Sequence, residues 1–250
     1  ACILAGTSAV APRAATNCEE KGKQWQPPSC CIGTAATGGR GLFLTQDIAK
    51  GEAIFQEAAV LDSGCTSTAL KAVFPKAPPD ESQARSEPIW GLVANYIHLC
   101  QGSESSAKAA QALERLKEFF RPSGKDTAHS SMYTGHAELM KDAMCDSAKV
   151  TVDELRDLLQ LVRHNAHIVR EAHSGTASHL PLHGLGLFFW LHLANHSCWP
   201  NAFFQSSLDG SGSAVTLMAL RDVEAGDEVC ISYVDGHTLL SPLEVRRRVL

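Results

Sequence analysis

The chain has 250 residues, of which 44% are apolar and 20% are charged, and its formal net charge is −5. That is enough apolar material for the core of one large domain or two small ones. A negative charge without a basic stripe argues against nucleic acid as a direct ligand and suits a basic peptide. The longest apolar run, 180–193, contains His183 and His192 and is too short to span a bilayer, so we expect no membrane partner.

The nine cysteines are an odd number, and no two of them have C-x-x-C spacing. This pattern argues against a disulfide framework and against a self-contained zinc finger. It favours a reducing compartment, the nucleus or the cytoplasm. Cys30 and Cys31 are adjacent and could form a vicinal disulfide, but two free thiols are the expected state.

The beginning of the chain has the composition of a leader. The first residue is Ala rather than Met, which indicates a processed or excised piece. Residues 1–15 are small and apolar, and their one charge, Arg13, lies on the wrong side for a signal peptide. Residues 16–37 are rich in Pro, Gly, Ser and Thr, so we expect no regular structure there and treat 1–37 as a flexible leader.

Two short strands are predicted next, at 41–45 and 53–61, with a turn between them at 49–51. Residues 62–85 contain three prolines and scattered small residues. We expect a loop there with at most one helical turn, because proline and small residues disfavour longer elements.

Helical spacing of apolar residues dominates the following part of the chain. A first helix is predicted after Pro88 and a second at 105–120, and the ambiguous stretch 129–145 is expected to be helical from Gly135. Thr151-Val-Asp-Glu154 has the form of a capping box, in which the two side chains bind the free backbone N–H groups of a helix start. It predicts a long helix through Val162.

Strand character returns at 202–204, 214–220 and 229–234, and a last helix is expected from Ser241. The order is therefore strands, then helices, then strands. That order favours an α+β domain with a helical insertion at 62–150 over a doubly wound α/β fold.

Two polar segments stand out from this background. The heptapeptide Asn195-His-Ser-Cys-Trp-Pro-Asn201 directly follows the apolar run, and Pro200 makes it a poor helix and a poor strand. Its side chains can satisfy buried backbone groups or hold a ligand. Gly38-Gly-Arg-Gly41 precedes a strand and either forms a tight turn or lets a ligand approach the main chain.

With Gly226-Asp-Glu-Val-Cys-Ile-Ser-Tyr233, these segments resemble the SET-domain protein-lysine methyltransferases, most closely their SMYD-like branch without the MYND zinc module. The resemblance implies a SET fold of short β-sheets with a pseudoknot-like crossing, covering 38–250. It also implies S-adenosylmethionine as cofactor and a protein or histone-tail lysine as the methyl acceptor.

The resemblance assigns roles to individual residues. Tyr233 matches the catalytic tyrosine, and Arg40 would reach the methionine carboxylate of the cofactor. Residues of the crossing loop that match structural positions are Ser197, Pro200 and Asn201. The residues implied in cofactor binding are Gly39, Arg40, Gly41, Asn165, Asn195 and His196.

Two positions depart from the family pattern. His192 stands where the family often has Ser, which affects one cofactor contact. Cys198 matches a zinc ligand whose three partner cysteines, in the SMYD-like branch, belong to a C-terminal post-SET segment after Leu250. Zinc is therefore expected in the intact protein and not in this piece.

Two other functions remain as alternatives. The first is a catalytically inactive SET-fold protein-binding module, suggested by His192 and the missing post-SET segment. The second is a histidine-dependent metalloenzyme, suggested by His164 and His167. Their H-x-x-H arrangement lacks both the i, i+4 spacing and the intervening Glu of a metallohydrolase, so surface histidines are the plainer interpretation.

Overall fold

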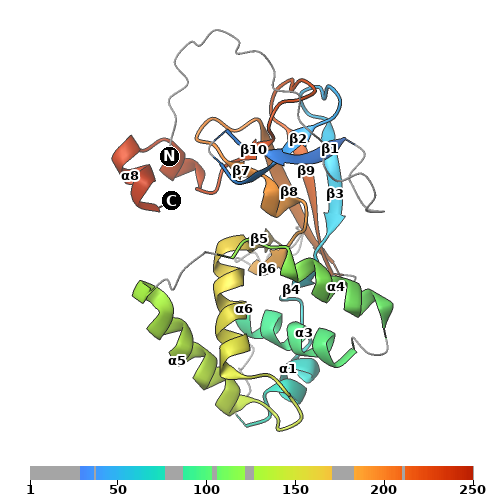
Figure 1. Ribbon diagram of the computed structural model, residues 1–250, viewed down its shortest axis with the longest axis vertical. Helices are drawn as coiled ribbons and strands as arrows, with labels where there is room; N and C mark the ends of the chain where they lie inside the picture. The colour runs from blue at the N-terminus through green and yellow to red at the C-terminus, as the bar shows by residue number, and fades with distance from the viewer. Residues whose placement is uncertain are drawn as a thin grey trace, which may run out of the picture. The chain divides into compact units, whose positions relative to one another are not determined.

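The computed structural model describes residues 29–36, 38–76, 87–102, 106–121, 127–170, 183–209 and 212–249 (Figure 1). The chain divides into two compact units. Unit 1 comprises residues 1–56, 193–205 and 216–250, and unit 2 comprises residues 57–192 and 206–215. Most of the expected leader, 1–28, lies outside the described residues. No helix among the described residues is long and apolar enough to cross a membrane.

Unit 1 begins with an antiparallel hairpin of β1 (Cys30–Thr34) and β2 (Arg40–Leu44). The expectation of no regular structure up to residue 37 is wrong at β1. Cys30 and Cys31 are buried at its start and both are free thiols. Pairing with β2 and burial of this apolar Cys-Cys-Ile run outweigh the polar composition around it.

A glycine turn closes this hairpin. The N–H of Gly38 donates to the carbonyl of Ala35 (2.9 Å), and the N–H of Ala35 donates to the carbonyl of Gly39 (3.0 Å). Gly38 and Gly39 have φ angles of +86° and +83°, a region that side chains disfavour. The turn alone therefore requires glycine at these two positions.

Two short parallel strands of unit 1 join distant parts of the chain. β7 (Asn195–His196) pairs with β10 (Cys230–Ile231). β10 is shorter than the predicted strand 229–234. Beyond it, the N–H of Tyr233 donates to the side chain of His196 rather than to a strand partner.

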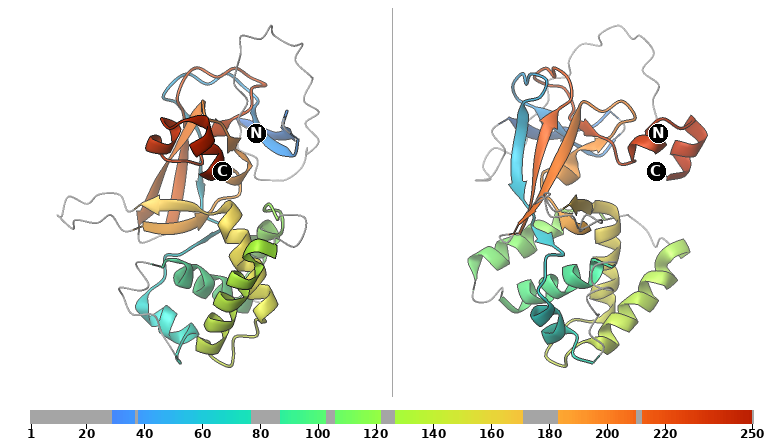
Figure 2. Two further views of the ribbon diagram at one scale, coloured as in Figure 1. Left: turned by 90° about the vertical axis from the view of Figure 1, so that its left-hand side faces the viewer. Right: turned by 180° about the vertical axis from the view of Figure 1, so that it is seen from behind.

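The third sheet has the strand order β3-β9-β8, and each strand contributes residues to both units. The predicted strands at 53–61 and 214–220 correspond to β3 (Ala53–Ala58) and β9 (Gly212–Ala219). β8 (Ala202–Asp209) extends well past the predicted residue 204. The two long strands run side by side in both views of Figure 2.

The last part of unit 1 is helical. α7 (Gly236–Leu239) and α8 (Leu243–Val249) contact one another. α8 corresponds to the helix predicted from Ser241, since Pro242 stands just before its first turn, where a missing N–H costs nothing.

Unit 2 contains most of the helices and a small antiparallel sheet with strand order β4-β6-β5. The sheet strands are β4 (Leu61–Asp62), β5 (His167–Arg170) and β6 (His183–Leu187). A short 3₁₀ helix, η1 (Leu191–Leu193), follows β6. The helices are α1 (Ser67–Val73), α3 (Ile89–Gly102), α4 (Ala107–Lys117), α5 (Thr127–Ala143) and α6 (Val152–Asn165).

Helices α3, α4 and α6 confirm the predicted periodicity, whereas α1 corrects the loop expected at 62–85. α1 begins where the hydroxyl of Thr66 accepts a hydrogen bond from the N–H of Ala69 (3.2 Å), which caps the helix start. Leu70 and Val73 are buried on one side of it. Helix α5 begins at Thr127, earlier than Gly135, where we expected helical structure to start.

The helices of unit 2 pack closely around an apolar core. A Cβ atom at Gly91 of α3 would lie 2.2 Å from the carbonyl oxygen of Ser63, so this approach requires glycine. Helices α5 and α6 lie against one another (Figures 1 and 2). Large side chains that are fully buried in this unit are Phe74, Leu92, Ile97, Met144, Leu155, Leu187, Phe188 and Leu191.

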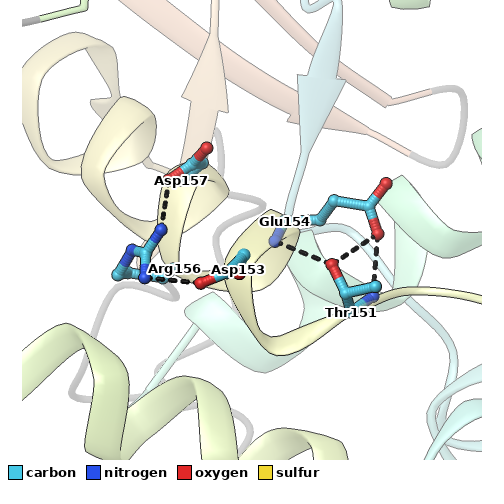
Figure 3. A network of polar contacts seen from close by, with 5 residues as sticks. All are labelled: Thr151, Asp153, Glu154, Arg156 and Asp157. Atoms are coloured by element: carbon cyan, nitrogen blue, oxygen red, sulfur yellow. Dashed lines mark hydrogen bonds and ion pairs between the residues drawn. The ribbon is translucent and has the colours of Figure 1, made fainter.

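The predicted capping box at the start of α6 is present (Figure 3). The N–H of Glu154 donates to the hydroxyl oxygen of Thr151 (3.2 Å), and the Glu154 carboxylate accepts from the N–H of Thr151 (2.7 Å). Arg156 contacts both Asp153 and Asp157 on the exposed side of the same turn. The cap satisfies donors that would otherwise have no intrahelical partner.

We predict that Thr151→Ala lowers the free energy of unfolding by about 1 kcal/mol, because the Glu154 N–H loses its acceptor. Urea denaturation followed by circular dichroism measures this change. Asp157→Asn is the matched control, since its long, exposed ion pair with Arg156 should contribute less than about 0.5 kcal/mol. Equal losses in the two variants would contradict the capping role.

Glu57 is an acidic side chain in an apolar part of unit 2. Its carboxylate accepts from the N–H groups of Trp190 (3.0 Å) and Leu191 (2.7 Å), at the start of η1. Burial raises the pKa of Glu57 to about 7, against the opposing effect of these N–H groups and of the Arg115 charge. The folded chain therefore holds this proton more tightly than the unfolded chain does.

This raised pKa predicts a pH-dependent stability. Between pH 4.5, the ordinary value, and about 7, the folded state binds more protons than the unfolded state. The Glu57 contribution to the free energy of unfolding is therefore largest below pH 4.5 and is lost as the pH rises through about 7. We expect Glu57→Gln to reduce this slope in urea titrations, whereas Glu138→Gln, at an exposed position of α5, keeps it. An unchanged slope in Glu57→Gln would contradict the assignment.

Candidate functional site

One amide group connects three distant segments of unit 1. The side-chain nitrogen of Asn195 donates to the backbone carbonyl of Arg40 (3.1 Å) and to the carboxylate of Glu228 (2.7 Å). Arg40 belongs to the glycine-rich segment, Asn195 to the heptapeptide, and Glu228 to the segment that leads to Tyr233. The three motifs singled out in the sequence therefore meet around Asn195.

The end of the heptapeptide is hydrogen-bonded to the segment that leads to Tyr233. The side chain of Asn201 accepts from the N–H of Cys230 (2.8 Å) and donates to the carbonyl of Glu228 (2.8 Å), as a neighbouring strand would. The Ser197 hydroxyl accepts from the N–H of Trp199 (3.0 Å), within the loop. These contacts hold the crossing together, which is the role that the resemblance implies for Ser197 and Asn201.

Tyr233 follows β10 and is held at two points. Its backbone N–H donates to Nδ1 of His196 (3.0 Å), and its hydroxyl donates to the carbonyl of Ala194 (2.9 Å). The residue as a whole remains 53% exposed. The phenol is thus fixed beside the heptapeptide while part of its surface stays open.

The surroundings of Tyr233 keep its hydroxyl protonated. Partial burial of the phenol raises its pKa to about 12, and the thiol of Cys230 and the carboxylate of Glu228 act in the same direction. A phenol has one proton to donate, and that proton goes to Ala194. The oxygen lone pairs are what it can offer to another molecule.

His196 is a neutral hydrogen-bonding group in this arrangement. Its Nδ1 accepts from Tyr233, so the ring proton resides on Nε2, which lies 3.3 Å from the sulfur of Cys198. Burial and the nearby charge of Arg246 lower the pKa of His196. Among the described residues, no group of three or more His, Cys, Asp or Glu side chains is placed to hold a metal ion.

Asn165 lies in unit 2, where its side chain is 4% exposed. Its amide nitrogen donates to the carbonyls of Phe120 (2.9 Å) and Leu161 (2.7 Å), and its oxygen accepts from the N–H of Phe120 (3.1 Å). These bonds hold the segment that follows α4 against helix α6. A contact of Asn165 with a cofactor stays a prediction.

The other histidines singled out in the sequence also lie in unit 2. His192 stacks on Phe119, with ring centroids 4.3 Å apart. His167 is half-buried near Phe188, and desolvation of its ring and the neighbouring His192 lower its pKa to about 4. His164 is exposed and packs edge-on to Phe120. His164 and His167 therefore occupy different surroundings, which gives the metalloenzyme alternative no support.

Two participants in the site were not identified from the sequence. In the sequence Glu228 stands out only as part of a strand-forming segment, although a carboxylate beside an otherwise apolar strand is a recognisable feature. Ala194 contributes a backbone carbonyl, for which a sequence offers no marker. Both become apparent only when β2, β7 and β10 are placed side by side.

This fold and site define a known class of protein. The model of the SET domain family matches residues 39–234, which is most of the chain. The chain therefore belongs to the SET domain family. The chain is similar to a solved structure, the SET domain of LSMT bound to lysine and AdoHcy. The match covers 83% of this chain and 50% of that chain, with a TM-score of 0.50 and 16% sequence identity. That likeness confirms the predicted α+β SET fold.

Among individual proteins, the chain is similar to members of the SMYD group. It is 33% identical over 91 residues to the protein-lysine N-trimethyltransferase SMYD5 of Mus musculus, which covers 36% of this chain and 21% of that protein. It is 40% identical over 67 residues to the histone-lysine N-methyltransferase SMYD3 of Mus musculus, covering 27% and 14%. The matches span less than a third of these relatives' length.

The two bonds of Asn201 generate a stability prediction. Asn201 is 7% exposed, so Asn201→Ala leaves one backbone N–H and one carbonyl without their partner. We expect the free energy of unfolding to fall by about 2–4 kcal/mol, because each buried group left unsatisfied costs about 1–3 kcal/mol. Urea denaturation of the whole chain, followed by circular dichroism, measures it.

The matched variant is Asn201→Asp, which keeps an acceptor for Cys230 but turns a carboxylate towards the carbonyl of Glu228. We expect it to be destabilised as well. A loss below about 0.5 kcal/mol in both variants would contradict the fastening role of Asn201.

Proposed function

We propose that this chain is the SET domain of an S-adenosylmethionine-dependent protein-lysine methyltransferase. Family membership supports the proposal, as do the names of the SMYD5 and SMYD3 relatives. The observation that carries it is the convergence of Arg40, Asn195 and Tyr233, from three distant segments, within unit 1. The lysine and AdoHcy in the LSMT structure are the ligand classes that such a site would take.

The residues around Asn195 fit the amino-acid end of such a cofactor. No described atom lies within 4 Å of the position that a Cβ atom would take at Gly39, so a ligand can approach the backbone there. Arg40 is exposed and supplies a guanidinium for a carboxylate. The side-chain oxygen of Asn195 supplies an acceptor.

The bound cofactor would supply an electrophilic methyl group on a sulfonium, and this chain would supply alignment. The acceptor lysine has to be neutral, because its nitrogen lone pair forms the new N–C bond as the S–C bond breaks. A free lysine has a pKa near 10.4 and is charged at neutral pH, so it would first release a proton to solvent. Methyl transfer would then leave S-adenosylhomocysteine as a neutral thioether. Tyr233 has no need to act as a base. Its oxygen lone pairs, left over after it donates to Ala194, can accept an N–H of the amine and orient the nitrogen.

Alignment of this kind can account for a large part of the rate. Correct orientation of two reactants can lower a barrier by about 7–11 kcal/mol. Tyr233 suits this task because its backbone N–H, its hydroxyl and its ring all contact Ala194 or His196. A residue held both at its backbone and at its side chain loses little further freedom when it orients a substrate.

We also propose the class of substrate, the cellular compartment and a zinc ligand. The substrate is a protein lysine, on a histone or another protein, as in the names of the two SMYD relatives. The compartment is a reducing one, nucleus or cytoplasm, which the free thiols of the seven described cysteines support. Zinc binding by Cys198 stays a prediction for the intact protein, since the described residues around it do not form a metal site, and the methyl transfer above does not use it.

We predict that Tyr233→Phe lowers kcat for methyl transfer by about 100-fold or more, because the amine loses its orienting oxygen. The dissociation constant for S-adenosylmethionine should change less than about threefold, because the ring and backbone contacts remain. Transfer of labelled methyl groups to a panel of proteins and histone peptides measures kcat, and calorimetry measures binding.

Tyr96→Phe, in helix α3 of unit 2, serves as the control and should keep wild-type activity. Retention of more than a tenth of the activity in Tyr233→Phe would contradict the assigned role. Wild-type protein that binds the cofactor but methylates nothing in the panel would favour the inactive binding module.

A further inference from the structure

Glu228 lies at the centre of the contacts that hold the site together. The backbone of Glu228 forms an antiparallel bridge with Phe43 of β2. The N–H of the neighbouring Val229 donates to the carbonyl of Leu42 (2.7 Å). Its backbone carbonyl accepts from Asn201, and its carboxylate accepts from Asn195. The backbone of Glu228 is thus fixed on two sides, which determines where its carboxylate can reach.

The two acceptors around Asn195 decide which way its amide faces. A side-chain amide nitrogen carries two hydrogens. One of them goes to the carboxylate of Glu228 (2.7 Å) and the other to the carbonyl of Arg40 (3.1 Å). If the amide were turned over, its oxygen would face two acceptors and both bonds would become repulsive.

Gly41 provides the space for this arrangement. A Cβ atom at residue 41 would lie 2.6 Å from the carboxylate oxygen of Glu228 and 3.2 Å from the amide nitrogen of Asn195. The backbone of Gly41 does not have a positive φ, so turn geometry does not account for the glycine here. The close approach of the two side chains does.

We infer that Glu228 is a positioning residue that turns the oxygen of Asn195 towards the α-ammonium group of the cofactor's methionine end. The inference rests on the proposed function. With both nitrogen hydrogens used, the oxygen is the part of the Asn195 amide left for a ligand, and it binds only donors. The ammonium and the carboxylate of a methionine share one carbon, so a residue bonded to the backbone of Arg40 is next to the group that Arg40 would bind.

The negative charge of Glu228 also favours binding of an ammonium group by the Asn195 oxygen. An ammonium is a cation, and hydrogen bonds from a charged donor are about twice as strong as those between neutral groups. The carboxylate lies one hydrogen bond behind the accepting amide and polarises it, because hydrogen bonds in a chain strengthen one another. Glu228 therefore favours a ligand with a free amino group over one without it.

Two ligands and three substitutions of Glu228, to Asp, Gln and Ala, test this inference in the intact protein. S-adenosylhomocysteine carries the amino-acid end, whereas 5′-methylthioadenosine has the same adenosine and sulfur but lacks that end. Glu228→Asp keeps the charge but withdraws the carboxylate by one methylene. Glu228→Gln keeps the reach and an accepting oxygen but removes the charge. Calorimetric titration gives the dissociation constants.

We expect Glu228→Asp and Glu228→Ala to weaken S-adenosylhomocysteine binding by about tenfold, the usual loss for one oriented hydrogen bond, and methylthioadenosine binding by less than twofold. Glu228→Gln should keep S-adenosylhomocysteine binding within about threefold of wild type. Asp227→Ala, an exposed carboxylate one residue earlier, is the control and should change neither constant. In an Asn195→Ala background, Glu228→Ala should add less than twofold, because its effect passes through Asn195.

Different results would contradict the inference and the proposed function. Equal weakening of both ligands by Glu228→Asp would show a purely structural role and overturn the inference, and so would additive effects of Glu228→Ala and Asn195→Ala. If wild-type protein binds S-adenosylhomocysteine and Glu228→Asp binds it equally well, the inference fails while the proposed function stands. If wild-type protein binds neither ligand, the proposed function fails and the inference fails with it.

Discussion

The site depends on the hydrogen bonds between the heptapeptide 195–201 and the segment 228–233. These two stretches are some thirty residues apart, and they pair as parallel strands over only two residues each. Two further backbone bonds join them, from the N–H of Ser197 to Ile231 and from that of Asn201 to Cys230. Side chains add to these: Asn195 and Asn201 both bond to Glu228, one to its carboxylate and one to its carbonyl. A two-residue ladder is too short to be stable alone, so these amides take the place of the missing strand partners.

This use of side chains explains why Tyr233 is held firmly outside a regular strand. Where the ladder ends at Ile231, His196 and Ala194 take over as acceptors for the N–H and the hydroxyl of Tyr233. A tyrosine inside a longer strand would have its N–H satisfied by a neighbouring backbone and its ring directed by the pleat. Ending β10 early lets the ring orientation be set by the heptapeptide itself, which contains Asn195 and His196, the residues that the sequence predicts to contact the cofactor.

Local patterns predicted part of the structure well. The capping box at Thr151 and the apolar stripe of α6 depend on residues three and four apart, and both are present. The order of strands and helices gave the correct fold class. The shorter elements were less predictable. β1 was missed because its burial depends on pairing with β2, and α1 because the prolines after Val73 dominated the composition of 62–85.

Side-chain roles in the site were less accessible than the fold. The sequence singled out the three motifs, but the bond from Asn195 to Glu228 joins residues 33 positions apart and depends on tertiary placement. The hydrogen bonds of Asn165 were equally impossible to predict from the local sequence. The buried amide makes three hydrogen bonds to the backbone of Phe120 and Leu161, and no local pattern predicts them.

The glycine segment shows how structural and functional requirements can be separated within one motif. Turn geometry by itself requires glycine at residues 38 and 39, where φ is positive, whatever the turn is next to. Gly41 has no such requirement, yet a side chain there would collide with Glu228 and Asn195. A tight turn and a ligand-binding segment are therefore not competing interpretations of Gly38–Gly41. The first two glycines close the hairpin, and the third leaves room for the carboxylate that orients Asn195.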